Sequence, residues 1–519
     1  MEQQFLEEIT KGYTFKSDFI LLGGAVLDGK IVEGAQVKAP LKMFNRHGLI
    51  AGATGTGKTK TLQKLAESLS EKGVSVLMMD MKGDVSGISK SGVENPKLVE
   101  RSNSLNYQWK AKGFPVEFLN ITEGNGVRLR ATVTEFGPVL FSKILELNDT
   151  QSGVVALVFK YCDDHKIPLI DLKDFKKTLQ YLTNQGKAEI EKEYGRISTA
   201  STSTIIRKII EIETQGAEKF FGELSFDVED LCRIDENGNG YINILRLTDL
   251  QDKPKLFSTF MLQLLAEIYA TFPEEGDMDQ PKLVVFIDEA HLIFDEASKA
   301  LLQQLETIIK LIRSKGIGIF FCTQLPTDIP ANILGQLGMK IQHALRAFTA
   351  QDRKAIKLTA QNYPETDFYK TEDVLTSLGI GEALITTLNE KGNPTPLAHC
   401  ILLPPSSRMD TISDEELNEL IEKSQLVKKY FNRIEGESAY EILNNKIEGK
   451  IEEQEKISST TQQQASASIQ SNTRAEKSVI EQAAANPLVR TIAKELTRGL
   501  LGALGLGTTR RTTRKGGWF

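Results

Sequence analysis

The sequence predicts an α/β fold in which helices cover a mostly parallel β-sheet. Between about residues 40 and 405, short apolar runs alternate with amphipathic stretches, which is the pattern of strand–helix units. The runs are apolar throughout rather than at every second position, as strands must be when both faces of a sheet are covered. A glycine-rich octapeptide, "GATGTGKT", directly follows the first run. A turn of this kind between a strand and a helix is where α/β proteins hold phosphate groups.

Nine apolar runs are expected to form buried parallel strands: 47–52, 74–80, 115–120, 241–247, 282–290, 316–324, 339–347, 382–388 and 399–404. Helical patterns separate many of these runs, among them 58–72, 254–270 and 297–314.

Two segments interrupt this alternation. Residues 135–235 contain several helical patterns and few strand signals, which predicts a helical insertion in the α/β core. Residues 453–486 are rich in Gln, Ser and Ala and too poor in aromatic residues to bury much surface. The expected segments are a short N-terminal segment with reduced, barrel-like hairpins (1–40), the first part of the core (41–134), the helical insertion (135–235), the second part of the core (236–405), a helical extension (406–452), a polar linker (453–486) and an amphipathic helix with a basic tail (487–519).

The composition is that of a soluble globular protein, with 519 residues, 40% of them hydrophobic and 25% charged, and a net charge of −6. This length predicts two or three structural units. The sequence contains no run of about 18 apolar residues and no N-terminal secretory signal, so no membrane span is expected. The four cysteines, Cys162, Cys232, Cys322 and Cys400, are far apart, which predicts reduced thiols in the cytoplasm.

The octapeptide fits the P-loop pattern G-x-x-x-x-G-K-[ST]. Its glycines let the backbone turn round phosphate groups and point N–H donors at them, and the following helix adds the positive end of its dipole. Lys58 is expected to bridge the β- and γ-phosphates of ATP, and the Thr59 hydroxyl to bind Mg²⁺. The alternative is a glycine-rich turn without a ligand. The expected nucleotide-binding residues are Gly52, Ala53, Thr54, Gly55, Thr56, Gly57, Lys58, Thr59 and Lys60.

A second signal is "KLVVFIDEAHLIF", an apolar strand that ends in Asp288 and Glu289. Asp288, at the carboxyl end of a strand, can hold the Mg²⁺ shell, and Glu289 can polarise an attacking water. The adjacent carboxylate favours an ATPase over a P-loop kinase, whose acceptor is a substrate rather than water. The alternative is a buried strand whose two acids cap the following helix.

Two further strand ends carry polar side chains. Gln324 ends an apolar run, where it can sense the γ-phosphate or be satisfied by the loop backbone. Asp80, Lys82 and Asp84 follow another run, where they can order water or magnesium or simply cap a turn.

These signals, in this order, resemble the HerA/FtsK group of P-loop motor ATPases, and in particular its bacterial HerA-like subgroup. The resemblance runs from about residue 10 to 505 and is carried by "NRHGLIAGATGTGKT", "DMKGDVSG", "VRLRATVTEFGPVL", "DEAHLIF", "LIRSKGIGIFFCTQLPTDIP", "LGQLGMKIQHALRAFTAQDRKAI" and "RTIAKELTRGLLGALG". It implies a RecA-like P-loop NTPase core, ATP hydrolysis with Mg²⁺, and a homo-hexameric ring with ATP at the subunit boundaries. Lys58 and Thr59 would be the Walker A pair, Asp288 and Glu289 the Walker B pair, and Gln324 the sensor.

The resemblance also implies an arginine that a neighbouring subunit supplies to neutralise charge in the transition state. Arg130, Arg313 and Arg346 lie in the matching stretches, and the sequence does not choose among them. Arg346 can also act within its own subunit, and each of the three can instead form a salt bridge on a solvated face. HerA proper carries a β-barrel domain before its P-loop, whereas about 46 residues precede the P-loop strand here, so one or two hairpins are expected.

The C-terminal segment carries an excess of positive charge. Basic stretches in the core, in contrast, are balanced by nearby acids. From 487 to 519, seven Lys or Arg residues and one Glu give a net charge of +6, and the start of this segment has the spacing of an amphipathic helix. The helix can dock on the core, on a neighbouring subunit or on a protein partner. The tail, with Trp518 and Phe519, can bind nucleic acid or adsorb to an anionic membrane.

Two functions remain open on this basis. The first is a hexameric ATP-driven DNA translocase or helicase, which the resemblance favours. The second is a ring ATPase that acts on or scaffolds protein partners, which the acidic core favours. A third, a nucleotide-binding structural protein without turnover, is disfavoured by the presence of Glu289.

Overall fold

The computed structural model describes residues 1–122, 124–251, 253–276, 278–294, 299–431, 437–449 and 451–452. The chain divides into two compact units, Met1–Asn444 and Asn445–Phe519. The architecture below is that of the first unit. The predicted linker (453–486) and the predicted C-terminal helix and basic tail (487–519) lie outside the described residues.

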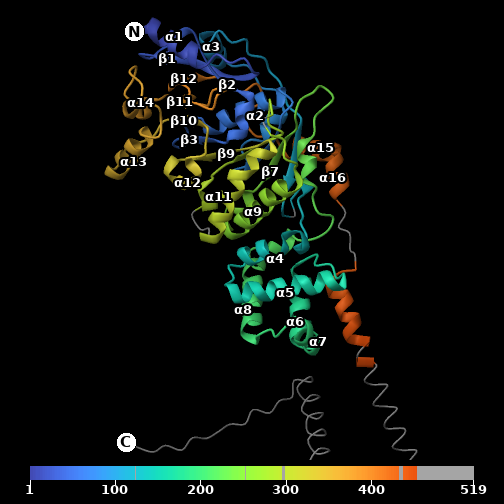
Figure 1. Ribbon diagram of the computed structural model, residues 1–519. Coiled ribbons are helices and arrows are strands. Elements are labelled where there is room, and N and C mark those ends of the chain that lie inside the picture. Colours follow the sequence, from blue (N-terminus) through green and yellow to red (C-terminus); the bar gives the residue numbers. More distant parts are fainter. Residues whose placement is uncertain are drawn as a thin grey trace, which may run out of the picture. The chain divides into compact units, whose positions relative to one another are not determined.

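A twelve-stranded sheet forms the centre of the described fold, in the order β2-β1-β12-β11-β10-β3-β9-β8-β4-β7-β5-β6 (Figure 1). Its strands are β1 (Phe19–Leu27), β2 (Lys30–Pro40), β3 (Gly48–Ala51), β4 (Ser75–Asp80), β5 (Val116–Asn120), β6 (Val127–Arg128), β7 (Ile242–Arg246), β8 (Leu283–Ile287), β9 (Ile317–Thr323), β10 (Met339–Gln342), β11 (Glu382–Thr386) and β12 (Ala398–Leu402). The eight strands from β10 to β6 run parallel.

All nine predicted runs contain a strand, but two of them, β11 and β12, do not form the expected parallel pairs. β11 pairs antiparallel with β10 and with β12. The apolar pattern reports that both faces are covered and carries no information on direction. The connection 387–397 between β11 and β12 contains no helix. Since a parallel pair needs a crossover of a dozen or more residues, this connection joins antiparallel neighbours.

Helices cover the sheet on both faces: α1 (Glu2–Gly12), α2 (Lys58–Glu71), α3 (Pro96–Ser104), α9 (Pro254–Thr271), α10 (His291–Phe294), α11 (Lys299–Ile312), α12 (Ala331–Leu334), α13 (Ala350–Ala360), α14 (Thr371–Ser377), α15 (Asp414–Lys423) and α16 (Gln425–Tyr430). On one face, Leu62, Leu65 and Leu69 of α2 join one buried cluster with sheet residues such as Val284 and Phe286. Side chains alternate along a strand, so Val285 between them faces the opposite side. α9 and α11 pack against each other.

Five α-helices lie between β6 and β7: α4 (Val133–Ile144), α5 (Asp149–His165), α6 (Leu172–Thr183), α7 (Lys187–Glu193) and α8 (Thr199–Glu213). Figure 1 shows α5, α6 and α8 gathered in one helical lobe. Its core includes Phe141, Phe159 and Phe175, whose ring centroids are 4.9–6.0 Å apart. α4 contacts α9 and α11 of the core. The exact segment boundaries stay a prediction.

The N-terminal residues extend the main sheet. β1 and β2 form an antiparallel hairpin, and β1 pairs with β12. Phe5 and Ile9 of α1 are buried, and the Tyr13 hydroxyl donates to the carbonyl oxygens of Ile385 (3.1 Å) and Pro396 (2.7 Å). Across the described ranges, none of the helices combines the length and the apolar character needed to cross a bilayer.

Candidate functional site

The P-loop lies between β3 and α2, and its backbone conformation requires glycine. Gly52, Gly55 and Gly57 have φ values of 150°, 79° and 108°, which side chains with a Cβ rarely adopt. A Cβ on Gly52 would lie 2.5 Å from the Cβ of His343. The Gly52 N–H donates to the carbonyl oxygens of Thr323 (3.3 Å) and Gln324 (3.1 Å). The end of β9 therefore holds the start of the loop.

Lys58 begins α2 and folds back over the loop. Its Nζ donates to the carbonyl oxygens of Gly52 (2.6 Å) and Ala53 (3.2 Å). Burial lowers the pKa of this ammonium, and the neighbouring carboxylates of Glu289 and Asp288 partly offset that effect. These carbonyl contacts place the Lys58 ammonium at the loop itself, where the motif requires it.

The other polar side chains of the loop differ in direction. The Thr59 hydroxyl donates to Oδ2 of Asp84 at 3.4 Å, on the side of the strand ends. The Thr56 hydroxyl donates to the Ala53 carbonyl at 2.7 Å and stays within the loop. Thr54 is exposed. Lys60 donates instead to the carbonyl of Met409, so its side chain is directed toward the segment after β12.

Asp288 and Glu289 follow β8, which is separated from the P-loop strand β3 only by β9. Burial, reinforced by the neighbouring Glu289, raises the pKa of Asp288 to about 6. Glu289 is 9% exposed and has a φ of 47°, a strained value for a residue with a Cβ. Its Oε2 lies 3.4 Å from Nδ1 of His291 and accepts no hydrogen bond from any described residue. One oxygen of this carboxylate is therefore available to a water.

The turn after β4 contributes to the same edge. Oδ1 of Asp80 accepts the backbone N–H groups of Lys82 (3.2 Å), Gly83 (2.7 Å) and Asp84 (3.3 Å), which is the turn-capping alternative. Burial raises the pKa of Asp80. The Lys82 ammonium forms an ion pair with Oε1 of Glu289. β4 is the neighbour of β8, so two adjacent strand ends meet here.

Gln324 directly follows β9, next to the P-loop. Its carbonyl accepts the Gly52 N–H, and its side chain is exposed. The side-chain amide lies at the edge of the sheet that carries the P-loop. This location fits both alternatives, a sensor of the γ-phosphate and an amide that bonds to the loop backbone. Its role as a sensor stays a prediction.

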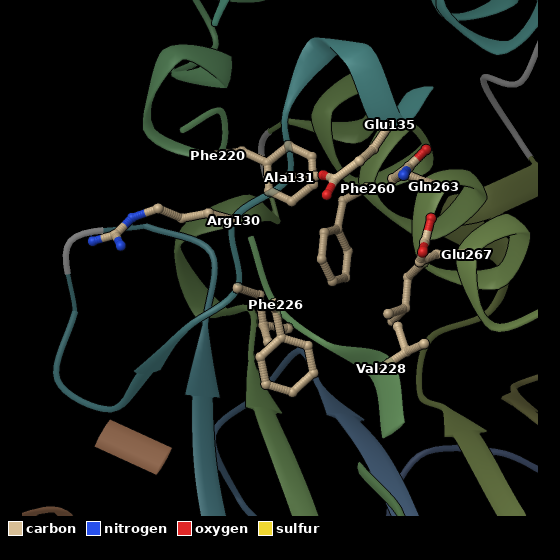
Figure 2. Close-up of a pocket in the computed structure, with 11 residues that line it drawn as sticks. Arg130, Ala131, Glu135, Phe220, Phe226, Val228, Phe260, Gln263 and Glu267 are labelled. Atoms are coloured by element: carbon tan, nitrogen blue, oxygen red, sulfur yellow. The ribbon is translucent and has the colours of Figure 1, made fainter. Parts of the chain in front are cut away.

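The three arginines occupy different environments. Arg130 is 8% exposed, and its guanidinium donates to the carbonyls of Glu223 (3.4 Å) and Tyr430 (3.3 Å). Figure 2 shows it at the rim of a pocket, pointing away from the rings of Phe226 and Phe260. These bonds within its own chain favour a structural role for Arg130.

Arg313 and Arg346 lie at opposite edges of the sheet. Arg313 is half-buried in the turn before β9, at the edge away from the P-loop. Arg346 is exposed, two residues after Ala344, whose carbonyl accepts the Ala53 N–H at 2.8 Å. Of the three, Arg346 therefore combines exposure with proximity to the P-loop edge.

Two supports of the loop were not found from the sequence. The buried His343 pairs through Nε2 with the Thr61 hydroxyl at 3.0 Å, and burial lowers the pKa of its ring to about 4. The Gly381 N–H donates to the Thr56 carbonyl at 3.0 Å, which ties the loop to the start of β11. The polar His343 within the apolar run 339–347 was the available signal, whereas a backbone N–H leaves none.

The residues at this edge fit a magnesium nucleotide. The loop glycines form a cradle that a Cβ would disturb, and Lys58 supplies a cation. Oδ1 of Asp84 and Oε2 of Glu289 are buried oxygens without a hydrogen-bond partner among the described residues. Such oxygens need a cation, a water or another donor. The fold and this site define a P-loop ATPase with a RecA-like core.

Comparison with known proteins gives the family. The family model described as "Helicase HerA-like C-terminal" matches residues 27–511. The chain therefore belongs to the HerA-like helicase family, within the HerA/FtsK type of motor ATPases. Proteins described as DNA double-strand break repair helicase HerA match from Sulfolobus acidocaldarius (24% identical over 378 residues) and Sulfurisphaera tokodaii (25% over 378). Each match covers 70% of this chain and 67% or 66% of the relative, about two thirds of its length.

Solved structures are more distant. The bacterial conjugative coupling protein TrwB, in its unbound monoclinic form, is 15% identical with a TM-score of 0.49, over 77% of this chain and 98% of that chain. VirB4 of Thermoanaerobacter pseudethanolicus is 17% identical with a TM-score of 0.45, over 78% of this chain and 100% of that chain. Similarity at this level carries no argument about function.

Proposed function

We propose that this protein is an ATP-driven DNA translocase or helicase that works as a homo-hexameric ring. The observation that carries the proposal is the convergence of Lys58, Asp288 and Glu289 at one sheet edge in a chain of the HerA-like family. The matching curated relatives are described as DNA repair helicases, and this supports DNA as the load.

In the proposed hydrolysis of ATP, each residue near the loop has a separate role. Bound Mg²⁺·ATP supplies the phosphoanhydride bond that water breaks. Lys58 leaves the loop carbonyls to bind the β- and γ-phosphates, and Thr59 and Asp288 hold the Mg²⁺ shell. Glu289 orients the attacking water and accepts its proton, for which Oε2 is available. Gln324 senses the γ-phosphate from the end of β9.

The arginine finger is assigned to Arg346. A finger must be exposed to reach a nucleotide held by a neighbouring subunit, and Arg346 is exposed. The buried Arg130 is assigned a structural role. Arg313, at the opposite edge, is retained as the second candidate because the ring brings different edges of neighbouring subunits together.

The net charge of the chain supports an alternative in which the ATPase moves or binds proteins rather than DNA. The chain carries a net charge of −6, whereas DNA phosphates attract Lys and Arg. A ring ATPase that acts on protein partners would fit this charge, and its partner could engage the basic C-terminal segment. The unpaired cysteines of the described residues fit work in the cytoplasm under either alternative.

Steady-state ATP hydrolysis tests the proposal, measured with Mg²⁺ alone, with single-stranded DNA and with duplex DNA, at low and moderate salt. The expected result is stimulation by DNA that fades with salt, since counterion release dominates affinity for phosphates. Lys58→Ala should remove both basal and stimulated hydrolysis. Hydrolysis that no DNA changes would retain the ATPase and reject DNA as the load. Size measurement with and without ATP tests the hexamer.

A further inference from the structure

A lysine that follows the adjacent strand contacts the proposed water-activating residue. The Lys82 ammonium pairs with Oε1 of Glu289, and the two side chains are 41% and 12% exposed. Lys82 belongs to neither nucleotide motif, because it follows β4 whereas Glu289 follows β8. In this conformation one oxygen of the general base is already occupied by a cation.

The turn that carries Lys82 is built to hold it at this place. Oδ1 of Asp80 accepts three successive backbone N–H groups, beginning with that of Lys82. Gly83 has a φ of 78°, and a Cβ there would lie 3.3 Å from Cγ2 of Thr248. The backbone of Lys82 is therefore fixed by bonds to a buried carboxylate, while its side chain extends toward the site.

Charge makes the Lys82 side chain a ligand for an anion as well as for Glu289. Burial alone would lower the pKa of Lys82, but the hydrogen bond that it donates to Glu289 and the charges of Asp288 and Glu289 outweigh burial and raise it. The ammonium stays charged at neutral pH. It also lies close enough to Lys58 to lower the pKa of that residue. Lys58 and Lys82 therefore both act near the carboxylates of Asp288 and Glu289.

We propose that Lys82 is a sensor of the γ-phosphate that controls Glu289. In the nucleotide-free chain, Lys82 pairs with Oε1 and ties the carboxylate to the β4 turn, which leaves Oε2 alone open to water. When ATP binds, the γ-phosphate carries more negative charge than one carboxylate and competes for the ammonium. Oε1 of Glu289 is then released, so that both oxygens of the carboxylate can act on the attacking water only while the terminal phosphate is present. ADP lacks this group and leaves the pair intact.

This inference rests on the ATP site of the proposed function and is independent of DNA as the load. It makes Lys82 a residue that touches substrate and positions the base through the same ammonium. It also predicts discrimination between ATP and ADP, which a purely structural ion pair would not provide.

Nucleotide affinity without turnover is the first test. Isothermal titration measures binding of Mg²⁺·ADP and of the non-hydrolysable imido analogue of ATP to the full chain. Lys82→Met should weaken binding of the ATP analogue at least about tenfold, the size of one charge-assisted hydrogen bond, and change ADP affinity by less than about twofold. Lys82→Arg should retain most of the discrimination, because it keeps the cation.

A matched control is Lys72→Met, which removes a lysine at the far end of α2 that pairs with Oδ1 of Asp18 at 2.8 Å. It should leave both affinities unchanged. Equal losses for ADP and for the ATP analogue in Lys82→Met would overturn the sensor and leave the ATPase intact. Failure of the wild-type chain to bind either nucleotide would overturn the ATP site and the sensor together.

A second measurement uses the nucleotide-free chain, so it does not depend on activity. Thermal unfolding is compared for the wild type, Lys82→Met, Glu289→Gln and the double variant. Lys82→Met should lower the melting temperature, because it leaves a buried carboxylate without its cation. Adding Glu289→Gln should restore most of the loss. Additive effects of the two changes would show that the pair is not coupled and would overturn the proposal.

Discussion

The P-loop edge and the junction between the core and the helical region both bury charged groups, and they treat them differently. At the junction, the Arg130 guanidinium is satisfied by the carbonyls of Glu223 and Tyr430. At the P-loop edge, Oε2 of Glu289 and Oδ1 of Asp84 are buried without a hydrogen-bond donor among the described residues. Buried polar atoms without partners are costly unless a ligand completes them. The comparison therefore separates a group that stabilises the fold from groups that we propose act on a bound ligand.

The change with the largest expected effect is Lys58→Ala at the P-loop edge. Loss of this cation removes the group proposed to hold the terminal phosphates, so nucleotide-dependent hydrolysis should vanish. Steady-state phosphate release measures it, with Lys72→Met as a control that removes a lysine elsewhere on the surface. Hydrolysis that persists in Lys58→Ala would mean that the site lies elsewhere.

The next change, Arg346→Ala, tests the assignment of the finger. A missing arginine finger should lower turnover by about 1,000-fold or more while nucleotide still binds. Arg353→Ala, which removes an exposed arginine on α13, is the matched control and should change turnover little.

Mixed rings determine which subunit Arg346 serves. Inactive Lys58→Ala and Arg346→Ala subunits, when combined, should regain part of the activity if the arginine acts on the neighbour, since an intact P-loop then faces an intact arginine. Mixtures that stay inactive at every ratio would contradict a role in trans.

Glu289→Gln should lower turnover less than Arg346→Ala does, but still strongly. The variant keeps the shape of the side chain and loses the base, so turnover should fall at least about 100-fold while ATP binding remains. Single-turnover phosphate release and a separate binding titration distinguish the two quantities. Near-normal turnover would rule out the assigned role and would return Glu289 to the helix-capping alternative.

Arg130→Met should give the smallest effect on activity and should act on stability instead. Without the guanidinium, the buried carbonyl of Tyr430 and the partly buried carbonyl of Glu223 lose a donor, which costs about 1–3 kcal/mol of unfolding free energy. Denaturant unfolding measures it, with Arg353→Met as the exposed control. A large loss of turnover per folded molecule, with unchanged stability, would contradict the structural role and assign Arg130 to ATP hydrolysis.

Much of the fold and of the site could be predicted because their signals are local. Each of the nine apolar runs contains a strand of the structure. The P-loop and the Asp288–Glu289 pair each lie within one short stretch of sequence. Strand direction and cross-strand contacts are not local. The pairing of Lys82 with Glu289 depends on β4 being the neighbour of β8, which no pattern within either stretch encodes. The same holds for Arg130, whose environment depends on Tyr430 from a distant segment.

The bond between Arg130 and Tyr430 has a practical consequence for truncation. The predicted core ends at residue 405, but Tyr430 lies beyond it on α16. The ring of Tyr430 packs on Phe226 at 5.0 Å, and its hydroxyl donates to Asp230 at 2.6 Å. A fragment that stops at 405 would lose these contacts and leave Arg130 with one carbonyl fewer. Expression of the ATPase without its C-terminal segment should therefore place the cut after Tyr430.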